Sequence, residues 1–184
     1  MVKLESGHDA ALGDLMGRHA EKLFNYLLRQ LQNDGDAADL AQEAFVRVYQ
    51  NRNKFDPGQK FSTWLYTIAT NLCRDRLRWR SRHPQVSLDA ENTESGATLL
   101  QHLPDAQPAP DEEMQSAERA KLVRSAVAQL PDELRIPLIL FEYEDRPRAE
   151  IAEILDCSVK AVEMRLYRAR HLLREKLTAV LPTI

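Results

Sequence analysis

The chain of 184 residues, with 43% hydrophobic and 29% charged side chains, has the composition of a globular protein of one domain or two small ones. No apolar run is long enough to cross a bilayer, and the N-terminus lacks the apolar core of a signal peptide, so we expect the protein to stay in the compartment where it is made, without membrane contact. The two cysteines, Cys73 and Cys157, have no Cys or His at metal-ligand spacing; we predict no disulfide, metal or cofactor.

The net charge of −3 hides an uneven distribution along the chain. Residues 1–82 carry 13 basic and 10 acidic side chains, and residues 117–184 carry 12 basic and 11 acidic ones. Residues 83–116 carry seven acidic side chains and no basic one. An acidic overall balance therefore does not exclude binding to nucleic acid, because local basic patches decide that question.

Residues 1–82 are predicted to be mainly helical, since glycine is rare and apolar residues recur every three or four positions. The expected segments are a helix over Ala10–Gln32, a turn at 33–36, a helix over Ala37–Asn51, a loop over Phe55–Lys60, and a helix capped by Ser62 or Thr63 that runs to about Arg82.

The acidic segment 83–116 contains four prolines and little periodicity, which predicts a flexible linker between two helical domains, residues 1–82 and 117–184. Helices are expected after it over Met114–Ala128 and Pro131–Tyr143. The fold class predicted is therefore all-α, with two small domains.

The segment from Arg148 to Arg174 has the pattern of a helix-turn-helix. Asp156 tolerates the left-handed backbone of a tight turn, and Ser158 is placed to cap the second helix. That helix has a buried stripe of Val162, Leu166, Ala169 and Leu173, and an outward face of Lys160, Met164, Tyr167, Arg168 and His171. The basic face favours DNA binding, while a surface helix pair with solvated arginines is the alternative.

Two further helix faces carry polar groups. Asp39, Gln42 and Glu43 share one face, which fits either a solvated surface or a docking site for a basic partner helix. In the helix that follows, Leu65, Ile68, Ala69 and Leu72 form a predicted core stripe, and the other face carries Trp64, Thr67, Asn71, Arg74 and Arg78. Aromatic side chains stack on unpaired bases and arginines neutralise phosphates, although Trp64 and Tyr66 could instead complete a small core.

No catalytic motif is present in the sequence. The chain has no nucleophile elbow, phosphate loop or HExxH motif, and its five histidines are scattered. We therefore predict no catalytic residues and no enzymatic activity.

Four segments in this order resemble sigma factors of the extracytoplasmic-function (ECF) type: DAADLAQEAFVRVY, FSTWLYTIATNLCRDRLR, LPDELRIPLILFEYEDR and AEIAEILDCSVKAVEMRLYRAR. The resemblance implies a sigma-2 domain at 1–82, an acidic linker at 83–116 that runs towards the RNA exit path, and a sigma-4 domain at 117–184.

The same resemblance implies a role for each polar face. Asp39, Gln42 and Glu43 would bind the clamp helices of the polymerase β′ subunit. The loop Phe55–Lys60 would hold a flipped base, and Thr67 and Ile68 would replace the tryptophan pair of housekeeping sigma factors. The implied −10 contacts are Lys60, Phe61, Ser62, Thr63, Trp64, Thr67, Asn71, Arg74 and Arg78, and the implied −35 contacts are Lys160, Glu163, Met164, Arg165, Tyr167, Arg168 and His171.

The chain departs from the family pattern at two positions. Asp156 stands where a glycine is usual, which the turn tolerates. Glu163 stands where Lys or Arg is common; a carboxylate repels phosphate but can accept a hydrogen bond from cytosine N4, so it alters the expected −35 sequence.

The predicted function is that of a bacterial, cytoplasmic transcription initiation factor without enzymatic activity. Its expected partners are core RNA polymerase, through the β′ clamp helices and the β flap, promoter DNA, and an anti-sigma factor. Three alternatives remain: a decoy that binds an anti-sigma factor without reading DNA, a helix-turn-helix activator that does not dock on polymerase, and an enzyme acting on nucleic acid.

Overall fold

The computed structural model describes residues 1, 4, 6–83 and 110–180, of which 110–117 and 179–180 by backbone alone. Every regular element within these residues is a helix, which confirms the all-α prediction. The elements are α2 (Ala10–Leu31), α3 (Asp34–Gln50), the short 3₁₀ helix η1 (Arg52–Lys54), α4 (Phe61–Arg82), α5 (Pro110–Ala128), α6 (Asp132–Glu142), α7 (Arg148–Leu155) and α8 (Val159–Val180). Residues 84–109 of the predicted linker lie outside the described residues.

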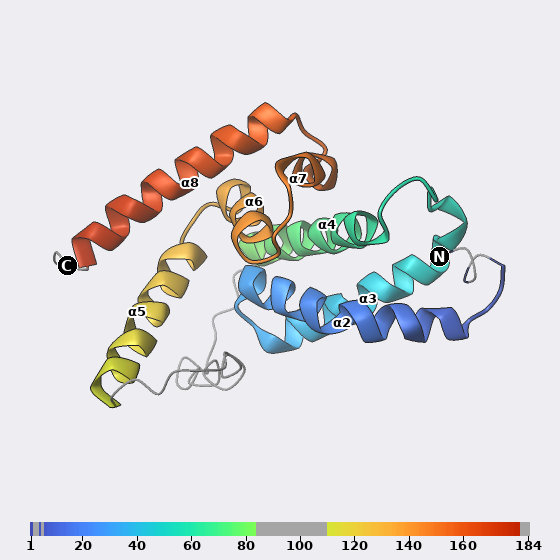
Figure 1. The fold of residues 1–184 in the computed structure, drawn as a ribbon, viewed down its shortest axis with the longest axis horizontal. Helices are drawn as coiled ribbons and strands as arrows, with labels where there is room; N and C mark the ends of the chain where they lie inside the picture. The colour runs from blue at the N-terminus through green and yellow to red at the C-terminus, as the bar shows by residue number, and fades with distance from the viewer. Residues whose placement is uncertain (2–3, 5, 84–109, 181–184) are drawn as a thin grey trace.

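Helices α2, α3 and α4 pack side by side and form an N-terminal unit (Figure 1). The hydroxyl groups of Tyr26 and Thr70 lie 2.8 Å apart inside this unit, so two buried polar groups satisfy each other. The apolar stripes of the three helices face one another and bury Leu23, Leu27, Leu40, Ala44, Phe45, Val48, Leu65, Ala69 and Leu72. Ile68, which was predicted to belong to this stripe, is only half-buried.

Helix α3 begins three residues earlier than predicted. Asn33 has an extended backbone, and its side chain accepts a hydrogen bond of 2.8 Å from the backbone N–H of Asp36. The residues predicted as a turn therefore form the first turn of the helix, where Asp34 and Asp36 suit the positive end of the helix dipole.

Helix α4 has no side-chain cap, so the predicted cap at Ser62 or Thr63 is wrong. The helix begins at Phe61, and Lys60 occupies the N-cap position. Both hydroxyl groups are placed elsewhere: Ser62 accepts a hydrogen bond from Arg146 at 2.9 Å, and Thr63 is buried. Both residues therefore lie inside the first turn of α4, and the partner of Ser62 comes from a distant part of the chain.

Helices α6, α7 and α8 form the core of a C-terminal unit, with α5 packed on α8. Apolar residues dominate the buried positions of α6 and α7, and one stripe of α8 packs on them. The buried side chains include Leu134, Ile136, Leu138, Ile139, Leu140, Ile151, Ile154, Leu155, Val162, Leu166 and Ala169. The predicted stripe of α8 is thereby confirmed at three of its four positions, while Leu173 is half-buried.

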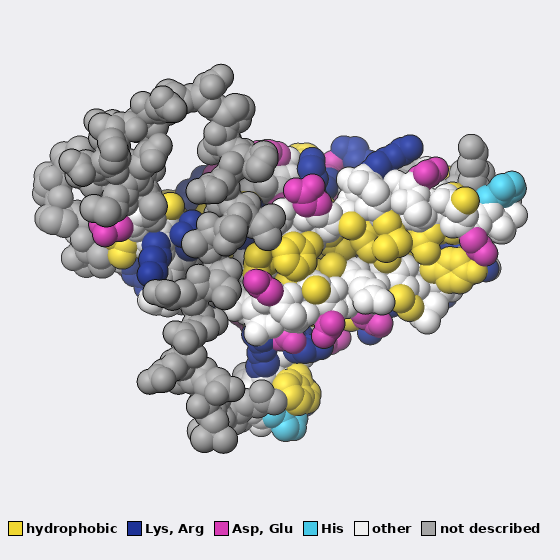
Figure 2. Space-filling view, turned by 90° about the horizontal axis from the view of Figure 1, so that it is seen from below, with side chains coloured by type: hydrophobic (Ala, Val, Ile, Leu, Met, Phe, Trp, Pro, Cys, Tyr) yellow, Lys and Arg dark blue, Asp and Glu magenta, His cyan; other side chains and the backbone are white. Residues whose placement is uncertain are grey.

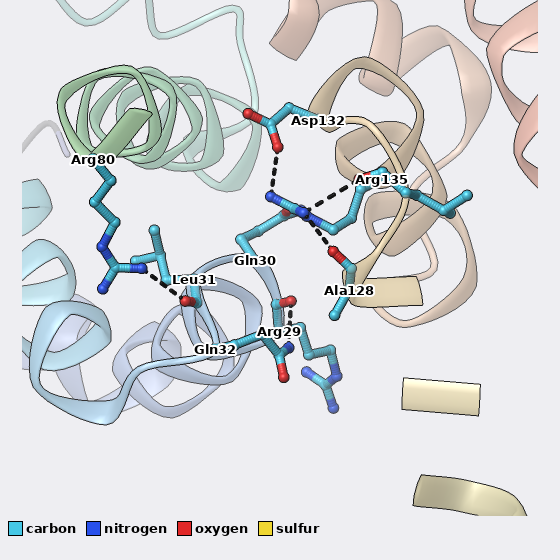
Figure 3. A network of polar contacts seen from close by, with 9 residues as sticks. Arg29, Gln30, Leu31, Gln32, Arg80, Ala128, Asp132 and Arg135 are labelled. Atoms are coloured by element: carbon cyan, nitrogen blue, oxygen red, sulfur yellow. Dashed lines mark hydrogen bonds and ion pairs between the residues drawn. The ribbon is translucent and has the colours of Figure 1, made fainter. Parts of the chain in front are cut away.

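The two units are in direct contact, because α6 packs against α2 and α7 packs against α4 (Figure 1). At one end of this contact the buried Arg135 donates to the backbone oxygen of Ala128 at 2.9 Å, to Asp132 at 2.6 Å and to Gln30 of α2 at 3.4 Å (Figure 3). The sequence predicted two domains and a linker but gave no sign of this contact.

Candidate nucleic-acid interface

The turn that precedes α8 has the predicted geometry. Asp156 adopts a left-handed backbone, with φ of 50° and ψ of 57°. The hydroxyl oxygen of Ser158 accepts a hydrogen bond of 3.1 Å from the backbone N–H of Ala161, in the first turn of α8. Both predictions for this turn are confirmed, and together they fix the angle at which α8 leaves α7.

The outward face of α8 is exposed as predicted. Met164 is 46% exposed and Tyr167 is 66% exposed, which is unusual for side chains of this size. Arg165 is half-buried, and its Nη1 lies 3.5 Å from the sulfur of Cys157. The exposed members of the predicted −35 set are Lys160, Glu163, Met164, Tyr167, Arg168 and His171. Such a face offers donors, one acceptor and apolar groups to the edges of base pairs.

A hollow of about 330 Å³ lies beside this face. Three arginines that were not predicted as site residues line it: Arg148, Arg170 and Arg174. Arg170 donates to Glu142 through Nε at 3.1 Å and Nη2 at 2.8 Å, and both Arg148 and Arg170 lie over the ring of Phe141. Arg174 lies one turn further along α8. Arg170 and Arg174 stand four residues apart, a spacing visible in the sequence, whereas their proximity to Arg148 depends on the packing of α7 on α8.

The start of α4 carries a cluster of aromatic rings. The ring of Trp64 lies 5.2 Å from that of Phe55 and 6.4 Å from that of Phe61, and His19 of α2 lies 5.2 Å from Phe61. Trp64 and Phe61 are half-buried, while Tyr66 is buried. The alternative that these aromatic residues complete a core therefore holds for Tyr66, and Trp64 keeps a partly accessible ring.

Three of the predicted −10 residues lie at the contact with the C-terminal unit. Lys60 forms an ion pair with Glu150 of α7, Ser62 accepts from Arg146, and Thr63 is buried. Burial raises the pKa of the Glu150 carboxyl, but its contacts with Lys60 and Arg146 outweigh that effect and hold the pKa below its usual value. The structure thus brings these predicted DNA contacts together with residues of the other unit.

The remaining predicted −10 residues continue along α4. Asn71 and Arg78 are exposed, and Arg78 lies 3.5 Å from Asp75 in a solvent-exposed pair. Thr67 is half-buried and donates a hydrogen bond of 2.9 Å to the backbone oxygen of Thr63, and Arg74 is half-buried. These side chains share one side of the helix, as their spacing predicts.

Two other arginines of α4 have structural contacts. Arg76 and Arg80 both form ion pairs with Asp36 of α3, and Arg80 also donates to the backbone oxygen of Leu31 at 3.0 Å (Figure 3). Leu31 is the last residue of α2, so Arg80 satisfies a carbonyl group at a helix end. The run of arginines at the end of α4 is therefore not one uniform basic patch.

The predicted docking face of α3 is accessible. Asp39 and Gln42 are exposed, and Glu43 accepts a hydrogen bond of 2.8 Å from Nε of Arg47. Val46, one turn beyond Gln42, is 40% exposed and was not predicted as part of this site. Figure 2 shows a band of hydrophobic side chains on the side of the molecule where α2 and α3 lie, with acidic groups along its edges.

Two negative findings apply to the part of the chain that the structure describes. No group of three or more His, Cys, Asp or Glu side chains is placed to hold a metal ion. No described helix is long and apolar enough to cross a membrane.

The sequence matches two protein-family models, Sigma-70 region 2 over residues 15–83 and Sigma-70 region 4 over residues 120–173. The chain is 36% identical to the ECF RNA polymerase sigma factor SigW of Bacillus subtilis, over 95% of this chain and 93% of that protein. It is 33% identical to the ECF RNA polymerase sigma-E factor of Escherichia coli K12, over 95% of this chain and 90% of that protein.

Solved structures share the fold over nearly the whole chain. The structure of CnrH in complex with the cytosolic domain of CnrY superposes with a TM-score of 0.69 at 26% identity, covering 97% of this chain and 94% of that one. The sigma factor RpoE of Bartonella quintana, in complex with the anti-sigma factor NepR, gives a TM-score of 0.67 at 23% identity, covering 90% and 96%. The chain belongs to the ECF family of RNA polymerase sigma factors, the transcription initiation factors that bind core polymerase and direct it to promoters.

Proposed function

We propose that the two units divide promoter recognition between them, with residues 1–82 acting on the −10 element, residues 117–184 acting on the −35 element, and residues 83–116 connecting them. The observation that carries this proposal is the outward face of α8, where cationic, aromatic and apolar side chains are exposed together. A buried stripe on the opposite side holds the helix on α6 and α7, so the exposed face is free to enter a major groove.

On the −35 element, Arg165 and Arg168 are assigned to guanine or phosphate, and Glu163 to a cytosine amino group. Lys160 and His171 lie nearer the two ends of the exposed face, where phosphates flank the groove. Met164 and Tyr167 offer apolar contact to thymine methyl groups. Arg148 and Arg174 extend the assignment, because their guanidinium groups in the hollow beside α8 suit the phosphates of the DNA backbone.

On the −10 element, the loop before α4 and one side of that helix are assigned to the melted strand. The partly accessible ring of Trp64 is suited to stacking on a base, and Asn71 to hydrogen bonding at a base edge. Arg74 and Arg78 are assigned to phosphates. Lys60, Phe61, Ser62, Thr63 and Thr67 complete this set around the first two turns of α4.

Core polymerase is assigned to the exposed face of α3. Asp39, Gln42 and Glu43 supply acidic and amide groups for a basic surface on the β′ clamp helices, and Val46 adds an apolar contact. The C-terminal unit is assigned to the β flap. Because the family relatives bear the name of RNA polymerase sigma factors, the decoy and the polymerase-independent activator are not favoured.

We further propose that the protein acts in the bacterial cytoplasm, without enzymatic activity, and is restrained by an anti-sigma factor. The solved relative CnrH, which is bound to the cytosolic domain of CnrY, supports the idea that this fold is held by a protein partner.

The test is run-off transcription with core polymerase across a promoter library. We expect defined transcripts from promoters that share both elements. Asp39→Ala should weaken core polymerase binding roughly tenfold while leaving DNA contacts intact, because it removes a charge that faces the partner. Glu133→Ala is the matched control, since Glu133 is an exposed acid on α6. Equal polymerase affinity for the Asp39→Ala variant and the wild type would contradict the proposal that α3 docks on polymerase. Absence of promoter-specific transcripts would contradict the proposal that the two units read a promoter.

A further inference from the structure

The hollow beside the outward face of α8 is framed by α6 as well as by α7 and α8. These three helices pack against one another (Figure 1). The last two residues of α6, Phe141 and Glu142, both contact arginines that line the hollow. Helix α6 carries none of the residues assigned to DNA, so direct reading of the promoter does not explain these contacts.

Phe141 provides one ring for two arginines. The guanidinium carbon of Arg148 lies 5.3 Å from the ring centroid, and that of Arg170 lies 5.2 Å from it. At these distances an aromatic ring attracts a cation. Phe141 is half-buried and packs against the hydrophobic core, so the fold fixes the position of its ring. The ring therefore restricts the direction of the Arg148 side chain, which is otherwise exposed and has many rotamers.

The charges around the hollow do not balance. Arg170 donates through Nε and Nη2 to one oxygen of Glu142, at 3.1 Å and 2.8 Å, and this carboxylate neutralises it. Arg148 and Arg174 form no ion pair with any residue that the structure describes. Glu163 also lines the hollow, so its three arginines are opposed by two carboxylates. The fold thus holds the like charges of Arg148 and Arg170 over one ring, an arrangement that a bound anion stabilises.

The anion that suits this hollow is a phosphate group. A guanidinium group presents its donors in a planar fork that matches phosphate oxygens. The arginines lie on the side of α8 where Tyr167 and His171 also line the hollow. These two residues belong to the face assigned to the −35 element, and contacts to backbone phosphates set the register of a helix on DNA. The DNA backbone therefore supplies the phosphate.

We propose that Phe141 and Glu142 are positioning residues for an arginine clamp that holds one DNA backbone phosphate beside the −35 element. Phe141 holds Arg148 in the direction of the phosphate. Glu142 fixes Arg170 and neutralises it, so Arg170 is part of the frame. Arg174 completes the clamp from the next turn of α8. This inference rests on the proposed function, in which α8 reads the −35 element.

The first experiment asks whether Phe141 acts through Arg148. The preassembled complex of core polymerase and the full-length chain is titrated onto a fluorescent promoter duplex chosen from the run-off library, over a range of salt concentrations. Phe141→Leu should weaken binding roughly fourfold and leave the salt slope unchanged, because the number of cationic contacts stays the same. Arg148→Ala should weaken binding and reduce the slope by about one. In the Arg148→Ala background, Phe141→Leu should have no further effect, and Phe141→Tyr should keep the wild-type affinity.

Tyr49→Leu is the matched control for loss of a ring under an arginine. Arg52 lies 4.4 Å from the centroid of Tyr49, in the N-terminal unit, so this variant should bind the duplex as the wild type does. An equal loss in Tyr49→Leu, or a loss from Phe141→Leu that persists without Arg148, would overturn the clamp. If the wild-type complex binds every duplex of the library equally, the proposed function fails instead. The same cycle then still decides whether Phe141 positions Arg148, because phosphate contacts do not depend on sequence.

The second experiment asks whether Glu142 neutralises part of the clamp. Glu142→Gln keeps an oxygen that accepts from Arg170 but removes the negative charge. Promoter binding should become about threefold tighter with a steeper salt slope, because the charge of Arg170 is released into the hollow. Glu133→Gln is the matched control, since it makes the same change at an exposed position of α6 outside the hollow, and it should leave binding unchanged. Unchanged or weaker binding by Glu142→Gln would show that Glu142 has no part in the clamp.

Discussion

Helices α4 and α8 are both 22 residues long and rich in arginine, yet their cationic side chains have different surroundings. In α4, Arg76 and Arg80 are tied to Asp36 of a neighbouring helix. In α8, Lys160 and Arg168 form no ion pair with any described residue. Helix α4 packs within a bundle, where two of its arginines form ion pairs with a neighbouring helix. Helix α8 has one side exposed to solvent. Arginine content alone therefore does not identify the residues that bind DNA.

The two cysteines provide the sharpest test of this difference in packing. Burial raises the pKa of Cys73 in α4 to about 12, while Cys157 lies half-buried in the turn before α8. A raised pKa keeps the thiol protonated at pH 8, so iodoacetamide should modify Cys157 at least about a hundredfold faster than Cys73. Peptide mass spectrometry over time measures both rates. In denaturant the two modification rates should converge. Similar rates in the folded protein would mean that Cys73 is accessible to the reagent and that α4 is not tightly packed.

Asp36→Ala tests whether the arginines of α4 have a structural role. The substitution leaves Arg76 and Arg80 without their shared carboxylate, and should lower the free energy of unfolding by about 2 kcal/mol, a value reduced because both arginines are about one-third exposed. Urea denaturation followed by circular dichroism measures it. Asp75→Ala, which removes the exposed partner of Arg78, should change stability by less than about 0.5 kcal/mol. Equal losses of stability in Asp36→Ala and Asp75→Ala would show that the part-buried ion pairs of Arg76 and Arg80 stabilise the protein no more than the exposed pair of Arg78 does.

Arg168→Ala tests the other side of the comparison. Because Arg168 is exposed and unpaired with any described residue, its loss should leave folding unchanged and weaken promoter binding by the polymerase complex roughly tenfold. Fluorescence anisotropy over a range of salt concentrations should show a slope smaller by about one if the contact is to phosphate. Arg80→Ala should instead reduce the stability of the fold and leave promoter binding largely unchanged, because Arg80 pairs with Asp36. A stability loss in Arg168→Ala would contradict the assignment.

The smallest effect concerns the starts of the two helices. Ser158 caps α8, so Ser158→Ala should lower the free energy of unfolding by about 1 kcal/mol, and Ser158→Asp should restore most of it. Lys60→Ala should cost little stability by comparison, because α4 has no side-chain cap and Lys60 is well exposed. Thermal denaturation of the three variants measures the order of their stabilities. A larger loss in Lys60→Ala than in Ser158→Ala would show that the Lys60–Glu150 pair between the two units stabilises the protein more than the cap of α8 does.

The sequence by itself determined the features that depend on neighbours within a few residues. The helical class, the left-handed Asp156, the Ser158 cap, the exposed face of α8 and most positions of the apolar stripes were predicted correctly, because helix periodicity and turn chemistry are local. Ile68 and Leu173 are the exceptions, since both are half-buried. The family resemblance followed from the order of four such segments.

Tertiary structure alone decided which polar groups are occupied by distant partners. Arg80 and Asp36 are 44 residues apart, and Tyr66 and Glu144 are 78 residues apart, so neither pair leaves a periodic signal in the sequence. The same reason applies to Ser62, whose hydroxyl group was predicted as a possible cap of α4 but accepts a hydrogen bond from Arg146 of the other unit. Contact between the units turned a predicted −10 surface into one that is partly covered, because packing of α7 on α4 brings the Glu150 carboxylate to Lys60.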